Sequence, residues 1–199
     1  MELQHVNVKL YLENAAKLVL EPLIPVFHNW IQDRVCEELL IDVADYRHVY
    51  AGPGLVLIGH EANYSIDCAD NRPGIRYNRK LILNGSNQDR LRHALRAVLT
   101  ACKLLESDPR LGESLRFNRR EMEFFVNDRL LSPNLEETYT AVKPELQSFF
   151  QRLFEGSEYS MQHQSAPGRL FSVTVKTFRQ FDPDTLLANL SRKVGATVE

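Results

Sequence analysis

The chain has 199 residues, of which 44% are hydrophobic and 25% are charged. These values are average for a globular protein, so they exclude a disordered chain, a collagen-like repeat and a disulfide scaffold. The 24 Lys and Arg residues nearly balance the 26 Asp and Glu residues, and the formal net charge is −2. This balance removes any global electrostatic argument for binding nucleic acid or an anionic membrane.

The cysteines and the N-terminal segment indicate a compartment. Cys36, Cys68 and Cys102 are odd in number and far apart, which excludes a C-x-x-C zinc or redox motif and suits a reducing environment. The N-terminus lacks the basic and apolar segments of a signal peptide. The longest apolar run covers only residues 55–58, far short of the roughly 20 residues of a membrane span. We therefore expect a soluble cytoplasmic protein without a membrane partner.

The first 60 residues predict strands and one helix. Residues 5–12 alternate apolar and polar, which is typical of a half-buried strand. Prolines at 22 and 25 suit the first turn of a helix, and strands are expected at 39–44 and 55–58. The apolar stripe of that helix is assigned to Ile24, Phe27, His28, Ile31 and Val35, with His28 as a core or boundary residue.

A hairpin is expected next, with its turn at residues 70–74. Aligning the two apolar faces places Cys68 opposite Ile75 and Ile66 opposite Tyr77. The polar faces agree with this register, because it also places an acid at 67 opposite an arginine at 76.

Three helices and three strands are expected in the rest of the chain. Residues 87–106 carry a core-facing stripe behind a capping box of Ser86 and Asp89. Residues 121–126 alternate as a strand. Asn134 and Glu137 are interpreted as the cap of a helix that Pro144 kinks or divides. Strands around 159–163 and 171–175 and a last helix from Asp182 complete the chain.

These elements predict an α+β fold, with a mainly antiparallel sheet and helices packed on one side. We expect one compact domain over 1–199. The order of elements suggests two ferredoxin-like β-α-β-β-α halves, 1–107 and 108–199, although the halves show no residue-level repeat.

One polar cluster could bind a ligand or a divalent metal, since carboxylate and imidazole are suitable ligands. It consists of Asp42, Asp45, His48, His60 and Glu61. The structural interpretation is that the acids pair with nearby arginines, and we favour it because the cluster lacks a recognised metal-ligand spacing.

Other chemistry has little support in the sequence. The chain has no nucleophile elbow and no nucleotide-binding glycine motif. Arg92 and Arg96 lie on the long helix and are candidates for binding phosphate or nucleic acid. A solvated helix face explains them better, so we do not expect a nucleic-acid partner.

Three segments resemble parts of an uncharacterised bacterial protein family. They are residues 23–28 (LIPVFH), 40–49 (LIDVADYRHV) and 52–61 (GPGLVLIGHE). The resemblance implies a bacterial, cytosolic origin and transfers no activity.

Two functions remain open. The leading hypothesis is a non-catalytic binding or assembly module that contacts itself or another protein through an apolar sheet or helix face. The alternative is an enzyme or small-molecule binder whose site lies near Asp42, Asp45, His48 and His60. The sequence does not indicate a substrate or a reaction.

Overall fold

The computed structural model describes residues 1–50, 52–111 and 115–192. The helices are α1 (Leu23–Asp33), α2 (Asn87–Ser107), α3 (Glu136–Leu153) and α4 (Pro183–Ser191), with short 3-10 turns η1 (Ala15–Lys17) and η2 (Ala69–Asn71). The strands are β1 (Val6–Leu12), β2 (Leu40–Tyr46), β3 (Gly54–Gly59), β4 (Ala62–Asp67), β5 (Gly74–Arg79), β6 (Phe117–Val126), β7 (Tyr159–His163) and β8 (Phe171–Thr177).

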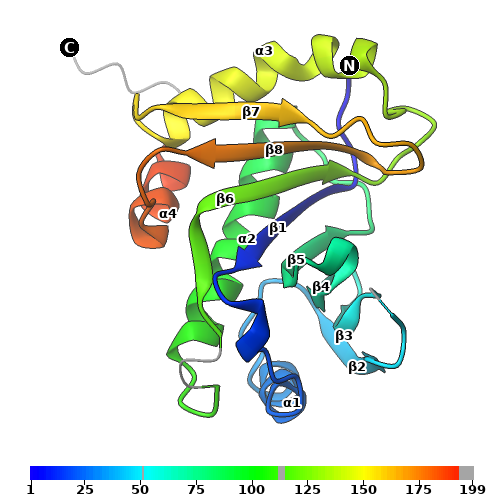
Figure 1. Cartoon of the computed structure of the whole chain (residues 1–199), viewed down its shortest axis with the longest axis vertical. Helices are drawn as coiled ribbons and strands as arrows, with labels where there is room; N and C mark the ends of the chain where they lie inside the picture. Colours follow the sequence, from blue (N-terminus) through cyan, green and yellow to red (C-terminus); the bar gives the residue numbers. More distant parts are fainter. Residues whose placement is uncertain (51, 112–114, 193–199) are drawn as a thin grey trace.

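The strands form one eight-stranded antiparallel sheet in the order β2-β3-β4-β5-β1-β6-β8-β7 (Figure 1). The α-helices pack on one face, so the predicted α+β fold is confirmed. Rings of α1, α2 and α3 contact rings of the same sheet face: Trp30 meets Tyr64, His93 meets Tyr77, and Phe150 meets Phe124.

The two halves of the chain follow related paths through this sheet. Each begins with a strand and a helix, continues into an antiparallel run, and ends in a helix. In each half the last strand of the run returns beside the first, β5 beside β1 and β8 beside β6. The second half has the expected β-α-β-β-α order, whereas the first carries four strands after α1. Because β1 pairs with β6, both halves share one sheet.

The core lies between the sheet and the helices. Val6, Val8 and Leu10 alternate onto the helix face of β1 and are fully or nearly fully buried, as predicted. Of the stripe assigned to α1, Phe27 is buried as predicted and Ile24 and Ile31 pack partly buried against the core, but the inward face is centred on Leu23, Val26, Phe27 and Trp30. Leu23 opens the helix and rotates the inward face, which leaves His28 exposed rather than in the core.

The hairpin of β4 and β5 forms with a register two residues away from the prediction. Ile66 pairs with Ile75 and Asp67 with Gly74, because η2 takes residues 69–71 out of the ladder. A shift of two residues leaves every side chain on its expected face, since side chains alternate with a period of two. A Cβ on Gly74 would lie 2.3 Å from the Leu10 carbonyl oxygen, so only glycine fits beside β1.

Helix caps distinguish α2 from α3. The capping box of Ser86 and Asp89 is present and begins α2 at Asn87. The cap predicted for α3 was wrong, because Leu135 is the N-cap and Asn134 instead donates to the Gln164 carbonyl at 3.0 Å. Pro144 does not divide α3, which buries Val142, Leu146, Phe149 and Phe150 along one face. This packing offsets the backbone hydrogen bond that proline removes.

Candidate functional site

The sheet face opposite the α-helices, here called the open face, is polar and nevertheless buried. It carries the alternate side chains of β1 and its neighbours, namely Asn7, Lys9, Tyr11, Asp67, Arg76, Asn78, Glu121, Glu123, Phe125 and Ser172. Asn7 and Ser172 are 0% exposed, Glu123 is 2% and Lys9 is 3%. Ionisable groups are rarely buried to this extent unless they are paired. Their partners therefore determine which of these groups are free to bind another molecule.

Asp67 occupies the middle of a first ion cluster. The Lys9 Nζ lies 3.5 Å from Asp67 Oδ1, and Arg76 Nη1 lies 3.1 Å from Asp67 Oδ2. Burial raises the pKa of Asp67, but the charge of Lys9 and the Ala69 backbone amide more than reverse this and lower the pKa overall. Burial also lowers the pKa of Lys9, and the charge of Asp67 opposes that effect. Asp67 is therefore a carboxylate shared by two cations from neighbouring strands.

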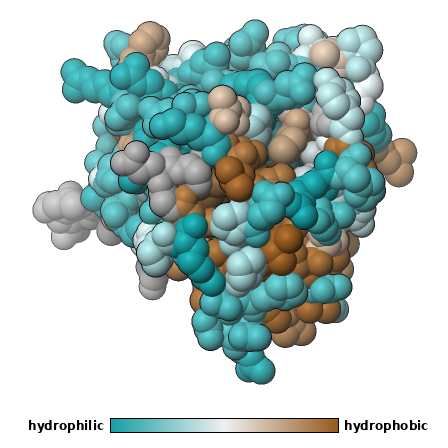
Figure 2. Space-filling view, turned by 60° about the horizontal axis from the view of Figure 1, so that its bottom comes forward, coloured by the Kyte–Doolittle hydropathy of each residue, from teal (hydrophilic) through white to brown (hydrophobic). Residues whose placement is uncertain are grey.

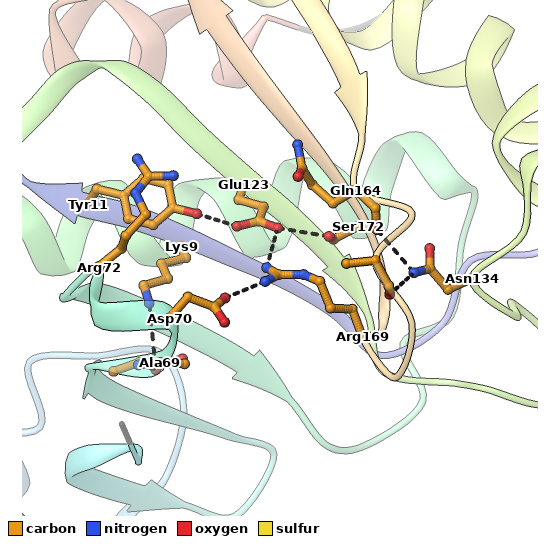
Figure 3. Close-up of polar contacts among 12 residues, drawn as sticks. Lys9, Tyr11, Ala69, Asp70, Arg72, Glu123, Asn134, Gln164, Arg169 and Ser172 are labelled. Atoms are coloured by element: carbon orange, nitrogen blue, oxygen red, sulfur yellow. Dashed lines mark hydrogen bonds and ion pairs between the residues drawn. The ribbon is translucent and has the colours of Figure 1, made fainter. Parts of the chain in front are cut away.

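Glu123 organises a second cluster beside the first (Figure 3). The Tyr11 hydroxyl donates to Glu123, the Ser172 hydroxyl donates to it at 2.8 Å, and Arg169 Nη2 donates at 3.2 Å. Arg169 lies in the loop between β7 and β8, and its Nη1 also pairs with Asp70 of η2. Burial and the charge of Glu123 raise the pKa of Tyr11, so this phenol stays protonated and acts as a donor.

Arginine side chains cover the open face. The Arg72 guanidinium lies 3.7 Å from the Tyr11 ring centroid and makes two hydrogen bonds to Glu121. The Arg76 guanidinium lies 4.6 Å from the Phe125 ring centroid. Arg76 belongs to β5 and Phe125 to β6, on opposite sides of β1, so their contact crosses over β1 and shields it from solvent.

Several buried polar atoms under this cover have no hydrogen-bond partner among the described residues. They include both amide atoms of Asn7, Asn78 Oδ1 and Arg76 Nε. Because neither Asn7 atom is paired, exchanging its oxygen and nitrogen would not satisfy it. Asn78 is the cross-strand partner of Asn7, so the unpaired atoms belong to adjacent positions. The open face can therefore both donate and accept hydrogen bonds that the fold does not use.

A second polar cluster lies on the helix side of the sheet. The Tyr64 hydroxyl donates to Glu38 Oε2 at 2.7 Å, and His93 Nε2 lies 2.9 Å from the Tyr77 hydroxyl and 3.5 Å from Glu38 Oε1. Burial alone would raise the pKa of Glu38, but hydrogen bonds from His93 and Tyr64 hold it at about 2. The Tyr64 ring contacts the rings of Trp30 and Tyr77 edge to face, and Cys36, whose pKa burial raises to about 12, lies near the carboxylate.

The residues predicted as a ligand or metal site are spread along β2 and β3. Asp42 accepts from the Val43 amide at 2.8 Å, and Asp45 is bound by Arg47, whose side chain also pairs with Glu21. The ring of His48 lies 6.4 Å from that of Tyr46 at the same end of β2. These are the arginine pairings and exposed positions of the structural interpretation.

His60 lies at the other end of the ladder. Its amide donates to the Leu39 carbonyl, and its Nδ1 lies 3.4 Å from Glu61 Oε1. Leu40 pairs with Gly59 and Asp45 with Leu55, so Asp45 and His60 are separated by about five strand positions, roughly 15 Å. The structure brings His60 and Glu61 together but not His60 and Asp45. Among residues 1–50, 52–111 and 115–192, no three His, Cys, Asp or Glu side chains are grouped to hold a metal ion.

The arginines considered for phosphate binding are engaged by the protein. Arg92 Nη1 donates to Asp89 at 2.7 Å, and Arg96 Nη2 lies 3.4 Å from both the Leu190 carbonyl and Ser191 Oγ. Arg96 therefore links α2 to the end of α4. These contacts account for both side chains without a ligand.

Two hollows lie beside α4 and meet at residues 180–182. One, of about 680 Å³, lies between the ends of α3 and β8, and the other, of about 690 Å³, contains three arginines of β6 and its approach. In the second hollow Arg119 donates to Glu106 at 2.5 Å. The buried polar atoms without partners in the described chain lie elsewhere, so neither hollow presents an unused buried donor or acceptor.

Exposed apolar side chains gather around the edge strand β2 and the start of the β5–α2 connection. Figure 2 brings this end of the molecule forward and shows hydrophobic residues there. They include Val35, Leu39, Ile41, Tyr46, Val49, Tyr50, Leu81 and Ile82, called here the β2 surface. In the described part of the chain, no helix is long and apolar enough to cross a membrane.

The residues of the open face were not identified from the sequence as a site. The alternation in β1 separated Asn7, Lys9 and Tyr11 from the core, and a half-buried strand normally exposes that side to water. The available signal was that β5 and β6 also alternate apolar and polar residues. Neighbouring strands that each carry a polar side can combine these sides into one polar face of the sheet. Their burial depends on Arg76 and Arg169, whose positions come from the tertiary structure.

No protein-family model matches the chain, and no curated protein matches it.

Proposed function

We propose that this chain is a non-catalytic binding protein and that its ligand lies against the open face. The observation that carries the proposal is the Asn7 amide, which is fully buried and unpaired at both atoms. An unsatisfied buried polar group costs about 1–3 kcal/mol of stability. Such a cost is expected where a bound molecule supplies the missing partners, because functional sites retain groups that do not serve the fold.

Binding accounts for this chemistry better than catalysis does. The shifted pKa values keep Asp67 ionised and Tyr11 protonated, so neither group exchanges a proton near neutral pH. Each is also held by partners from other strands, which fixes its position. The open face is therefore suited to recognising a polar molecule through fixed donors and acceptors. A cytoplasmic location agrees with this proposal.

The experiment is a fragment screen of the ¹⁵N-labelled protein by two-dimensional ¹H–¹⁵N NMR. Polar fragments that bind should move the side-chain NH₂ resonances of Asn7 together with amides of β1, β5 and β6. Asn7→Leu should abolish these shifts. The matched control is Asn63→Leu on β4, two strands away from β1, whose Oδ1 already accepts from the Gly59 amide. The proposal fails if fragments move only resonances around the hollows or the β2 surface, or if none reaches the open face.

A second candidate function is assembly with another copy of the chain through the β2 surface. Ile41 on the edge strand β2 is 55% exposed, and Leu39, directly before that strand, is 59% exposed, so burial against a partner would be favourable. Asp42 occupies the Val43 amide, which disfavours direct strand pairing and leaves side-chain packing as the contact. Light scattering after size exclusion should give twice 22.9 kDa for the native chain and a monomer for Ile41→Asp. A native monomer at high concentration rejects this candidate.

A further inference from the structure

The hydrogen-bonding capacity of Asn7 limits what its partner can be. A primary amide presents a donor beside an acceptor, and both are unpaired here. Its complement is an edge with an acceptor beside a donor, as in the bidentate pairing of asparagine with the N7 and N6 amino group of adenine. Asn78 Oδ1, at the adjacent strand position, is a further acceptor for a second N–H.

The surroundings of Asn7 favour a flat ligand. Phe125 is its cross-strand neighbour on β6, on the same sheet face. The Arg76 guanidinium lies over the Phe125 ring at 4.6 Å from the ring centroid. Aromatic rings and guanidinium groups both present planar surfaces for stacking. The planar Arg76 guanidinium thus already occupies the position on Phe125 that a planar ligand ring would take beside the Asn7 amide.

Arg76 is placed to act as a movable cover. Its side chain is 20% exposed, and Asp67 holds one end of the guanidinium at Nη1. Its Nε has no partner in the described structure, so that part of the group can turn without losing a hydrogen bond. Moving it outward would uncover the Phe125 ring and the Asn7 amide together.

Resting on the proposed function, the geometry points to a planar heterocycle with a hydrogen-bond donor beside an acceptor, such as a nucleobase, as the ligand of the open face. The ring stacks between Phe125 and Arg76, and its edge pairs with Asn7. A simple anion fits this position less well. The positive charges of Lys9 and Arg76 are already shared with Asp67, and Asn78 presents an oxygen.

The test is titration of the full chain with adenosine and with purine riboside, followed by calorimetry. Purine riboside keeps the ring and the sugar but lacks the exocyclic amino group that would donate to the amide oxygen. We expect adenosine to bind at least about tenfold more tightly, the discrimination that a bidentate pair provides. Asn7→Leu should remove this preference, and Phe125→Leu should weaken both nucleosides. Phe178→Leu, at a residue 67% exposed directly after β8, should change neither.

The inference is overturned if adenosine and purine riboside bind equally, if Asn7→Leu keeps the preference, or if neither nucleoside binds. Inorganic phosphate is titrated alongside, and binding of phosphate alone also overturns it. None of these results tests the proposed function itself, which the fragment screen tests separately. Fragments of other chemistry that shift the Asn7 resonances would retain the open face as a binding site, whereas their absence would reject both.

Discussion

The two faces of the sheet each bury a polar cluster, and they differ in how completely it is paired. On the helix side, Glu38 Oε2 accepts from Tyr64, and Glu38 Oε1 makes no hydrogen bond within the described chain but lies 3.5 Å from His93 Nε2, an ionic partner when the imidazole is protonated. On the open face, Lys9, Asp67 and Arg76 are paired, but the amide of Asn7 beside them is not. The comparison indicates that the helix-side cluster stabilises the core, whereas the open face keeps hydrogen-bonding capacity for another molecule.

The largest expected effect comes from breaking the paired part of the open face. Glu123→Ala removes the acceptor of Tyr11, Ser172 and Arg169 and leaves two buried hydroxyls without a partner. We expect a loss of about 3–5 kcal/mol in the free energy of unfolding. Urea denaturation measures it, with Glu123→Gln as the control that keeps the volume and one acceptor oxygen. A loss below about 1 kcal/mol would show that this network does not support the fold.

Acid should destabilise the helix-side cluster by a smaller amount. The pKa of Glu38 is about 2 in the folded chain against an ordinary value of 4.5, so its carboxylate stabilises the fold above pH 4.5. That contribution disappears as the pH falls toward 2. Between about pH 5.5 and about pH 3, the native chain should lose about 2 kcal/mol more stability than Glu38→Gln. Urea titrations across this range test it, and parallel curves would contradict a paired Glu38.

The outermost contact of the open face should contribute least to the free energy of unfolding. Asp70 pairs with Arg169 across the loops, but its side chain is 56% exposed. Water and salt weaken such pairs, so Asp70→Asn should cost no more than about 1 kcal/mol, and less at high salt. Thermal unfolding at two ionic strengths measures this. A loss as large as that of Glu123→Ala would mean that the loops, and not the strands, hold the open face together.

The fold followed from local patterns where those patterns were complete. Alternation defined β1 and β6, and the capping box defined the start of α2, because each signal depends on neighbouring residues. The predicted hairpin register was wrong by two residues, because two registers separated by two residues give identical faces and η2 selects between them. The inward face of α1 depended on Leu23 and Trp30, which the sequence pattern did not distinguish from Ile24 and Ile31.

The candidate site could not be found in the same way. The sequence drew attention to Asp45 and His60 because their residue types are common in catalysis, yet the pairing of β2 with β3 places them about five strand positions apart. Asn7 attracted no attention because a polar residue in an alternating strand normally faces water. Its burial requires Arg76 and Phe125 to meet across β1, and their strands are distant in sequence.

The most direct measurement of the central claim is the stability of Asn7→Leu beside Asn63→Leu. Leucine has nearly the shape of asparagine, so replacing an unpaired buried amide should raise the free energy of unfolding by about 1 kcal/mol. Asn63 accepts a backbone hydrogen bond at 3.3 Å, so the same change there should lower it by a similar amount. Opposite signs in urea denaturation would support an amide kept for binding. A loss of stability in Asn7→Leu equal to that in Asn63→Leu would show that Asn7 serves the fold, and would contradict the account.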